Sequence, residues 1–238
     1  GYSNVVPGTN RSSPLAEVLR SALRHGPQAH LQATGTESMR MSSLHYYDPS
    51  WIESTSETIE TDVCIYGGTS GGIAAAVTVA RSGLRVVVLQ PGKHIGGMTS
   101  GGLGWTDFGR KHVIGGLSRS FYQQVGRHYG LAEEWQFEPG VAEAVYGRGV
   151  DEHGIDVRCC QFLDSVESDA QQLRAIVLLG GLRVTARLFM DCTYEGDLMA
   201  MAGADFHVGR EANEVYGETL NGIQVRDMHQ FGLAVDPY

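Results

Sequence analysis

The sequence predicts an α/β fold in which a parallel sheet, built around a βαβ unit, carries an antiparallel three-stranded meander. Two short apolar runs flank a glycine turn and a helix of small residues within about 30 residues, the length of one βαβ unit. Further β-rich segments joined by turn residues follow later in the chain. Glycine is also in excess: 32 of 238 residues, of which 17 fall between positions 61 and 140, against a usual content of about 7%.

The βαβ unit is expected between residues 62 and 90. Asp62–Tyr66 is a short apolar run that ends in two glycines and is typical of a buried parallel strand. Ile73–Arg81 reads as a helix, which Ser82-Gly83 would end. Leu84–Gln90 is rich in β-branched residues and predicts the second strand. Because such crossovers are almost always right-handed, the two strands should be parallel neighbours.

The later elements alternate between helix and strand. We expect a helix at Leu117–Tyr129, a parallel strand at Gly154–Cys160, meander strands at Phe162–Glu167, Gln172–Leu179 and Leu182–Leu188 with turns at Ser168-Asp169 and Gly180-Gly181, a further strand at Phe189–Thr193, and a short helical run after Asp197. The segment Trp135–Val150 matches no clear pattern.

Residues 1–58 differ from the rest, with four prolines and little apolar periodicity. Only Leu15–Leu23 has the spacing of a short amphipathic helix. We therefore expect a flexible or poorly structured extension over 1–58, followed by one domain over 59–238 that is incomplete at its C-terminal end.

Composition excludes several classes of function. The chain has 27 acidic against 18 basic residues, a formal charge of −9, and no cluster of Lys and Arg that could neutralise phosphates, so no nucleic-acid partner is expected. Its longest apolar run, Ile73–Ala80, is far shorter than the roughly 20 residues of a membrane helix, so the protein should be soluble and without a membrane partner. No signal peptide is visible, and the four cysteines lack a CxxC spacing, which favours reduced thiols and a cytoplasmic location.

The glycine turn after the first strand carries the clearest chemical signal. Gly67–Gly72 (GGTSGG) approximates the dinucleotide fingerprint G-x-G-x-x-G of Rossmann-like βαβ units. Gly67 would make the tight turn, Gly72 would let the helix approach the sheet, and the helix N-terminus would attract a pyrophosphate. Thr69 stands at the middle glycine position, where its hydroxyl could donate to phosphate. A turn that binds nothing is the alternative interpretation.

Other chemistry is weaker. A ribose-binding carboxylate is expected where the second strand ends, but the residue is Gln90, whose amide would bind ribose less strongly. Ser70, within GTSGG, faintly resembles the G-x-S-x-G nucleophile elbow of serine hydrolases. The nine histidines show no HxH, HExxH or Cys/His spacing, so no metal is expected.

The run DVCIYGGTSGGIAAAVTVARSGLRVVVLQPGKHIGGMTSGGLGWTD resembles the N-terminal signature of FAD-dependent oxidoreductases that include xanthan-lyase-like proteins, with a glutathione-reductase-type flavin fold. The resemblance continues through FMDCTYEGDLMAMAGADFHVGRE and covers about residues 60–238. Gln90, where the family usually has Glu, and Cys192, where it usually has Ala, depart from its pattern.

The resemblance implies an FAD that lies extended across the sheet. Its pyrophosphate would meet the first glycine turn and its ribose Gln90, while Lys93 and His94 would lie near phosphate or adenine. The backbone of Leu163 would contact adenine, and a second glycine tract would pass beside the flavin. The implied cofactor-binding residues are Gly67, Gly68, Thr69, Ser70, Gly71, Gly72, Gln90, Pro91, Lys93, His94, Gly96, Gly97, Met98, Thr99, Leu163, Gly196 and Asp197.

The sequence thus favours an FAD-dependent oxidoreductase whose flavin accepts a hydride from an unidentified small organic substrate. A dinucleotide-binding module or truncated flavoprotein without turnover is the alternative, because members of the family are longer; a serine hydrolase is the third. No catalytic residue can be named. Arg119, Arg210, Glu211 and Tyr216 flank the expected site and could orient a substrate or lie on the surface. The oligomeric state is open.

Overall fold

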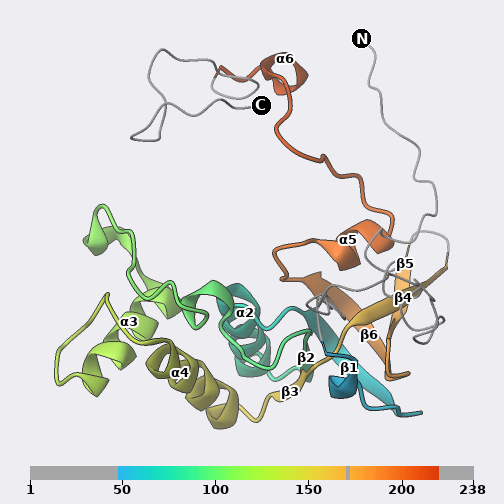
Figure 1. Ribbon diagram of the computed structural model, residues 1–238, viewed down its shortest axis with the longest axis horizontal. Helices are drawn as coiled ribbons and strands as arrows, with labels where there is room; N and C mark the ends of the chain where they lie inside the picture. The colour runs from blue at the N-terminus through green and yellow to red at the C-terminus, as the bar shows by residue number, and fades with distance from the viewer. Residues whose placement is uncertain (1–47, 170–171, 220–238) are drawn as a thin grey trace, which may run out of the picture.

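The computed structural model describes residues 48–169 and 172–219. Its centre is one six-stranded mixed sheet in the order β3-β2-β1-β6-β5-β4 (Figure 1). The strands are β1 Thr58–Tyr66, β2 Val86–Gln90, β3 Asp156–Cys159, β4 Leu163–Asp169, β5 Gln172–Leu178 and β6 Arg183–Asp191. The strands β3, β2, β1 and β6 are parallel, whereas β5 and β4 continue the sheet antiparallel. The predicted α/β fold with its βαβ unit and three-stranded meander is confirmed.

Both faces are buried over Val63–Tyr66 of β1 and Val86–Leu89 of β2, which explains the continuous apolar sequence of these two segments. In β1, Val63 and Ile65 pack under α2 (Ser70–Arg81), while Cys64 and Tyr66 point to the opposite face. On that opposite face of the sheet, the side chains of β1 and β2 pack with those of β4 and β5 in one hydrophobic cluster. Burial raises the pKa of the Cys64 thiol to about 12, so this cysteine is a neutral core residue.

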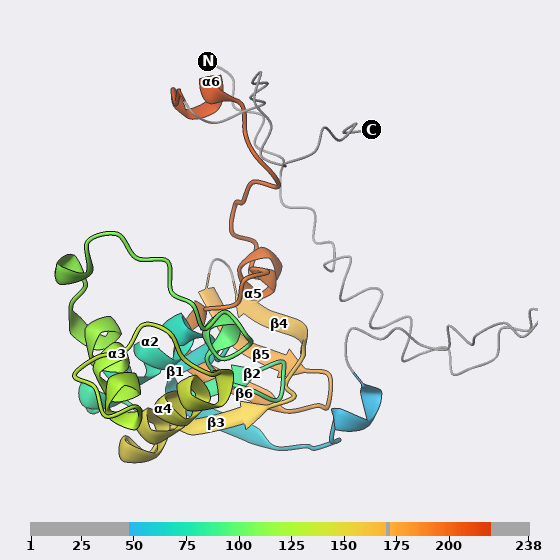
Figure 2. The ribbon, with the colours of Figure 1, turned by 60° about the vertical axis from the view of Figure 1, so that its left-hand side comes forward.

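Two further helices pack beside α2, on one side of the sheet (Figures 1 and 2). They are α3, Gly116–His128, and α4, Pro139–Glu152, and an aromatic and aliphatic cluster with Phe121 and Val145 joins them. The sequence predicted α3 within one residue at each end but gave no assignment for the segment that forms α4.

The strand β6 belongs to both halves of the sheet. It pairs in parallel with β1 from Thr58↔Arg183 to Tyr66↔Asp191 and antiparallel with β5 on its other edge. The expected division of this segment into a meander strand and a separate strand from Phe189 is therefore wrong, because one strand of nine residues crosses the boundary. The expected turn at Ser168-Asp169 is also wrong, since both residues lie in β4, whereas Gly180-Gly181 does turn between β5 and β6.

The ten residues just before the expected domain boundary at residue 58 belong to the part of the chain that the structure describes. A short 3-10 helix, η1 at Pro49–Trp51, packs Trp51 against Phe162 of the meander. The N–H of Thr55 donates to the carbonyl of Gly180 at 2.9 Å. Residues 48–57 thus contact the domain, and the expected helix at Leu15–Leu23 lies outside the described residues.

Short elements connect the larger ones. The 3-10 helices η2 Gly97–Thr99 and η3 Lys111–Val113 lie between β2 and α3, and the helix α5 Asp197–Met201 follows β6. Beyond α5, the chain runs away from the sheet to α6, Asn213–Tyr216 (Figures 1 and 2). Within residues 48–169 and 172–219, none of the helices combines the length and apolar character that crossing a bilayer requires.

Candidate cofactor site

Most of the predicted site residues, all except Leu163, lie in segments that leave the carboxyl edge of the parallel strands. Register pairs Tyr66 with both Leu89 and Asp191, so β1, β2 and β6 end side by side. The segments that leave this edge are the GGTSGG turn into α2, the loop from Gln90 to η2, and the turn from β6 into α5. In parallel α/β sheets this edge is where ligands bind.

Close backbone packing explains the outer glycines of the GGTSGG turn. Gly67 has φ +107°, and a Cβ there would lie 2.6 Å from the backbone nitrogen of Thr193. A Cβ on Gly72 would collide with the carbonyl oxygen of Gly67. Both expected roles, the tight turn and the close helix approach, are present. Gly71 differs, because it is exposed and a Cβ there would meet only the Thr69 hydroxyl, 3.7 Å away.

Thr69 binds the protein's own backbone. It is the N-cap of α2, where its hydroxyl oxygen accepts from the N–H of Gly72 at 3.1 Å. The same hydroxyl donates its proton to the carbonyl of Cys192 at 2.8 Å. Because a hydroxyl has one proton to donate, the carbonyl of Cys192 engages that proton in this arrangement.

Gln90 also turns toward the glycine turn. Its side-chain oxygen Oε1 accepts from the N–H of Gly68 at 2.7 Å, which leaves the amide NH₂ as the donor toward a ligand. The loop after β2 is joined to the chain after β3: the N–H of Cys160 donates to the carbonyl of Gly92 at 3.1 Å, and the N–H of Gln161 to that of Gln90 at 3.0 Å. Pro91 lies between these two carbonyls in sequence.

The second glycine tract is held between two tyrosines. Gly96 and Gly97 both have positive φ, +97° and +59°. A Cβ on Gly96 would lie 2.6 Å from the ring of Tyr146, and a Cβ on Gly97 would collide with the hydroxyl of Tyr194. That hydroxyl accepts from the N–H of Met98 at 2.9 Å. The two glycines thus accommodate tyrosines from α4 and from the turn after β6, a reason for the tract that sequence reasoning missed.

The two basic residues of this loop have partners in the protein. His94 contacts the carboxylate of Glu143 in α4 through Nδ1 at 3.0 Å, and the same carboxylate accepts from the N–H of Ile95. The ammonium of Lys93 lies 3.7 Å from the centre of the Trp51 ring, a cation–π contact. Both side chains are exposed, so they border the site rather than fill it.

The turn after β6 is built on Asp191. Its carboxylate accepts from the Thr193 hydroxyl at 2.6 Å and from the N–H of Met199 at 2.9 Å, which fixes the start of α5. Gly196 enters α5 with φ +73°. Partial burial, with the nearby carboxylates of Glu195 and Asp191, raises the pKa of Asp197 above its ordinary value.

Leu163, the first residue of β4, is buried, and its N–H donates to the hydroxyl of Tyr66 at 3.0 Å. Burial raises the pKa of that phenol well above its ordinary value, so it remains protonated. Of the backbone groups of Leu163, which was expected to contact adenine through its backbone, the N–H is thus engaged by Tyr66.

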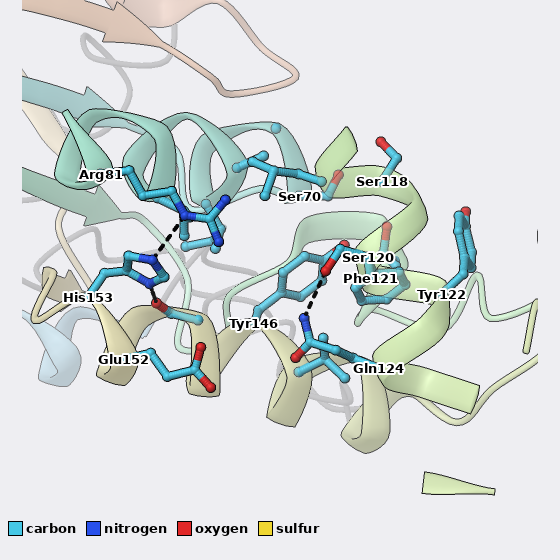
Figure 3. Close-up of a pocket in the computed structure, with 18 residues that line it drawn as sticks. Ser70, Arg81, Ser118, Ser120, Phe121, Tyr122, Gln124, Tyr146, Glu152 and His153 are labelled. Atoms are coloured by element: carbon cyan, nitrogen blue, oxygen red, sulfur yellow. Dashed lines mark hydrogen bonds between the residues drawn. The ribbon is translucent and has the colours of Figure 1, made fainter. Parts of the chain in front are cut away.

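A cavity of about 310 Å³ lies between α2, α3 and α4 and begins at Ser70, Gly71 and Thr99 (Figure 3). At its far end the Nε of Arg81 donates to Nε2 of His153 at 3.1 Å. His153 also contacts the carbonyl of Gly149 at 2.8 Å through Nδ1. His153 thus contacts Arg81 at the C-terminal end of α2, whereas Ser70 lies at its N-terminal end. The residues that line this pocket therefore include no Ser–His pair of the kind that a serine hydrolase requires.

The remaining candidate residues are placed outside the turns. Arg119 in α3 pairs with Glu133 at 2.7 Å and donates to the carbonyl of Lys111. Tyr216, on α6, is 65% exposed. In the part of the chain that the structure describes, no three His, Cys, Asp or Glu side chains gather as a metal site.

The residues of the GGTSGG turn fit the phosphate part of a dinucleotide. The N–H groups of Ser70 and Gly71 lie in the first turn of α2, where the helix itself provides no acceptor. A glycine with open space above it allows a ligand oxygen to approach the backbone closely, and the positive end of the helix stabilises an anion. Gly71 meets this requirement, whereas Gly67 and Gly72 are closed by the protein itself.

Comparison with known proteins identifies the family of this chain. The sequence profile of a family described as FAD dependent oxidoreductase matches residues 62–236. A search of curated proteins finds no match. The chain is similar to three solved structures: L-proline dehydrogenase from P. horikoshii (12% identity, 65% of this chain and 59% of that one, TM-score 0.49), a flavin-containing monooxygenase from Stenotrophomonas maltophilia (17%, 57% and 38%, 0.42) and the bacillithiol disulfide reductase from Staphylococcus aureus (15%, 57% and 38%, 0.41).

The chain spans only 38% to 59% of the length of these solved proteins. The family match, in contrast, extends over most of the chain and includes both glycine turns and the β6–α5 turn. The chain therefore belongs to the family of FAD dependent oxidoreductases, and its cofactor is FAD.

Proposed function

We propose that this chain binds the pyrophosphate of FAD at the first turn of α2 and that it acts as an oxidoreductase on a small organic substrate. The observation that carries the proposal is Gly71, an exposed glycine in the first turn of a helix at the carboxyl edge of a parallel sheet. Around it, Gly67, Thr69 and Gly72 are fixed by internal contacts, so the turn is already formed. A formed turn binds an anion without first ordering a loop.

The remaining residues would hold the rest of the cofactor. The free amide NH₂ of Gln90 would donate to a ribose hydroxyl, and the backbone of Gly96–Thr99 would flank the ribityl chain and flavin. Gly196 and Asp197 would close the site from the side of β6. When bound, the flavin supplies a two-electron acceptor for hydride from a substrate, and the protein supplies position and electrostatics. Residues 59–238 would form the FAD-binding domain.

The first test is the absorbance spectrum of the purified protein. Flavin bands at about 370 and 450 nm are expected to stay with the protein after free FAD is removed by gel filtration, either as isolated or after incubation with FAD. Absence of protein-bound flavin after incubation at saturating FAD would overturn the proposal.

A charge placed at Gly71 tests where the pyrophosphate lies. Gly71→Asp puts a carboxylate into open space at a helix N-terminus, a position that tolerates acidic residues, so folding should persist. The carboxylate would compete with the phosphates and weaken FAD binding at least about tenfold. Gly71→Asn, of the same size but neutral, is the matched control and should lose clearly less. Equal affinities of the two variants would contradict an anion at this turn.

Catalysis needs its own measurement. Anaerobic bleaching of the bound flavin by a candidate substrate would support the oxidoreductase, and recovery on admission of an electron acceptor would show turnover. A dinucleotide-binding module without turnover is the second candidate, because the described site residues account for binding of the cofactor and none of them is assigned a catalytic role. A protein that binds FAD but is reduced by no substrate while dithionite bleaches it would favour that module.

A further inference from the structure

The loop between β2 and η2 is bound to the GGTSGG turn through its backbone. The N–H of Gly96 donates to the carbonyl of Gly68 at 2.7 Å, and Gly96 forms an isolated parallel bridge with Thr69. The N–H of Gly68 donates to the side-chain oxygen of Gln90 at 2.7 Å. Both backbone polar groups of Gly68 are thus bound by the segment 90–96, so the distance between the two glycine segments depends on where Gly96 lies.

Side chains hold both backbone polar groups of Ile95, the residue before Gly96. The N–H of Ile95 donates to Oε1 of Glu143 at 3.3 Å, and its carbonyl accepts from the hydroxyl of Ser100. Ser100 directly follows η2 and belongs to the same loop, whereas Glu143 lies on α4, 48 positions further along the chain. Glu143 is therefore an anchor that a separate element provides for this loop.

The carboxylate of Glu143 has a second partner in the loop, and the helix that carries it is well fixed. Nδ1 of His94 lies 3.0 Å from Oε1 of Glu143 and 3.1 Å from Oε2. On α4, Ala142 and Val145 are buried in the cluster with Phe121, and the helix packs against both α2 and α3. One carboxylate on a packed helix thus holds two consecutive residues of the loop.

We propose that Glu143 is a positioning residue for FAD. Its carboxylate holds His94 and Ile95, so that Gly96 stays bound to Gly68 and η2 stays where it would flank the flavin. The inference rests on the proposed binding of FAD between the GGTSGG turn and this loop. A loop that is held in place before the cofactor arrives does not have to be ordered by it, and the affinity is higher for that reason.

The test is Glu143→Ala, with FAD affinity measured by flavin fluorescence quenching and the bound flavin examined by visible circular dichroism. We expect FAD to bind about three- to tenfold more weakly, the usual effect of a lost hydrogen bond, and the dichroism of the bound flavin to change. Since the Glu143 side chain is 35% exposed and alanine is a good helix former, the urea midpoint of the apoprotein should stay close to that of the wild type.

Two variants of the same helix serve as controls. Glu143→Gln keeps a side-chain oxygen that can accept from the N–H of Ile95, so it should bind FAD within about twofold of the wild type. Glu152→Ala removes an exposed carboxylate from the C-terminal end of α4 and should bind FAD like the wild type. Equal losses in Glu143→Gln and Glu143→Ala would overturn the acceptor role of the carboxylate.

Hydrogen exchange of the apoprotein measures the loop without the cofactor. In Glu143→Ala the amides of Ile95 and Gly96 should exchange several-fold faster, because the first loses its acceptor and the second is held through its neighbour. The peptide that contains Val86–Leu89 of β2 is the internal reference and should be unaffected, which separates a loosened loop from a destabilised domain. Unchanged exchange at Ile95 and Gly96 would show that Glu143 does not hold the loop.

The two proposals fail in different ways. A wild type that binds FAD, together with unchanged affinity and dichroism in Glu143→Ala, would overturn the positioning role alone. A wild type without FAD binding would refute the proposed function, and with it the role of Glu143 toward the cofactor.

Discussion

The hydroxyl of Tyr194 accepts a hydrogen bond from the backbone N–H of Met98 at 2.9 Å, across 96 positions of sequence. It joins the turn that leaves β6 to the loop that leaves β2. Since Met98 and Tyr194 are both more than half exposed, this contact is accessible to solvent and to a bound ligand.

Tyr194→Phe should loosen the loop without harming the core. The N–H of Met98 loses its acceptor, so its amide should exchange with deuterium several-fold faster, since its protection depends on this bond. Hydrogen-exchange mass spectrometry of the peptide that contains Met98 measures the change. Tyr216→Phe, at an exposed tyrosine of α6, is the control and should leave that peptide unaffected. Equal exchange in wild type and Tyr194→Phe would show that the bond does not hold the loop.

Adding a methyl group at the neighbouring glycines Gly71 and Gly72 should change the free energy of unfolding in opposite directions. Gly72→Ala drives a Cβ into the carbonyl of Gly67, where backbone meets backbone and neither side can yield cheaply. We expect a loss of about 2–4 kcal/mol in the free energy of unfolding in urea. Gly71→Ala has open space in the same helical turn and should gain about 0.4–1 kcal/mol through the unfolded chain. Similar effects of the two substitutions would contradict the packing described for this turn.

Two substitutions of Gln90 should have different effects, one on the free energy of unfolding and the other on the affinity for FAD. Gln90→Leu leaves the buried N–H of Gly68 without its acceptor and should cost about 1–3 kcal/mol of unfolding free energy. Gln90→Glu keeps an acceptor and adds a carboxylate oxygen that can accept from a ribose hydroxyl. FAD should then bind about three- to tenfold more tightly, because charge-assisted hydrogen bonds are stronger. Isothermal titration with FAD would detect this change, and weaker binding by Gln90→Glu would exclude ribose from this position.

The meander should show an acid-dependent contribution from one ion pair. Two hydrogen bonds from Arg183 of β6 reach Glu167 of β4, at 2.6 and 2.9 Å, and lower the pKa of that carboxyl. A carboxyl whose pKa falls on folding contributes stability above its unfolded pKa, and that contribution is lost as the pH falls through the folded value. Glu167→Gln should therefore have a slightly lower Tm at pH 7.

The difference between wild type and Glu167→Gln should shrink as the pH is lowered below 4.5, the ordinary value of the glutamate pKa. Thermal unfolding at several pH values measures it. Glu214→Gln, in the short helix α6, provides a control for loss of one negative charge. A difference that grows toward acid pH would contradict a Glu167 pKa that falls on folding.

Local sequence patterns were sufficient to predict the βαβ unit. The end of β1, Val63–Tyr66, and most of β2, Val86–Leu89, are continuous apolar runs, and the helix lies between glycine signals, so each element can be recognised within ten or so residues. The positions of Gly67 and Gly72 were predicted for the same reason, since the turn between a strand and its helix is a local structure.

The helix α4 escaped prediction because its apolar stripe is short. Only Ala142 and Val145 are buried, and Gly147 and Gly149 interrupt the segment, so no helical period stands out. Its stability comes from packing on α2 and α3, which a sequence window does not contain.

The two tyrosines were missed for a related reason. Tyr146 and Tyr194 contact glycines about 50 and 100 positions away, and no local pattern links such partners. The pair of adjacent glycines at Gly96-Gly97 was interpreted through a flavin, whereas the structure fills both Cβ positions with protein. The sequence signal that could have been used is the tyrosine in α4 and the tyrosine in the turn after β6, the two segments that pack against the tract in the structure.

The place of β6 in the sheet has a consequence for synthesis of the chain. The hydroxyl of Thr185 in β6 contacts the carbonyl of Ile59 in β1, 126 positions earlier. At ribosomal rates of about 5–20 residues per second, one edge of β1 waits on the order of ten seconds for its partner. An unpaired apolar strand edge invites association with other chains. Nascent chains that stop before residue 183 are therefore expected to depend on chaperones, although they already contain the complete GGTSGG turn.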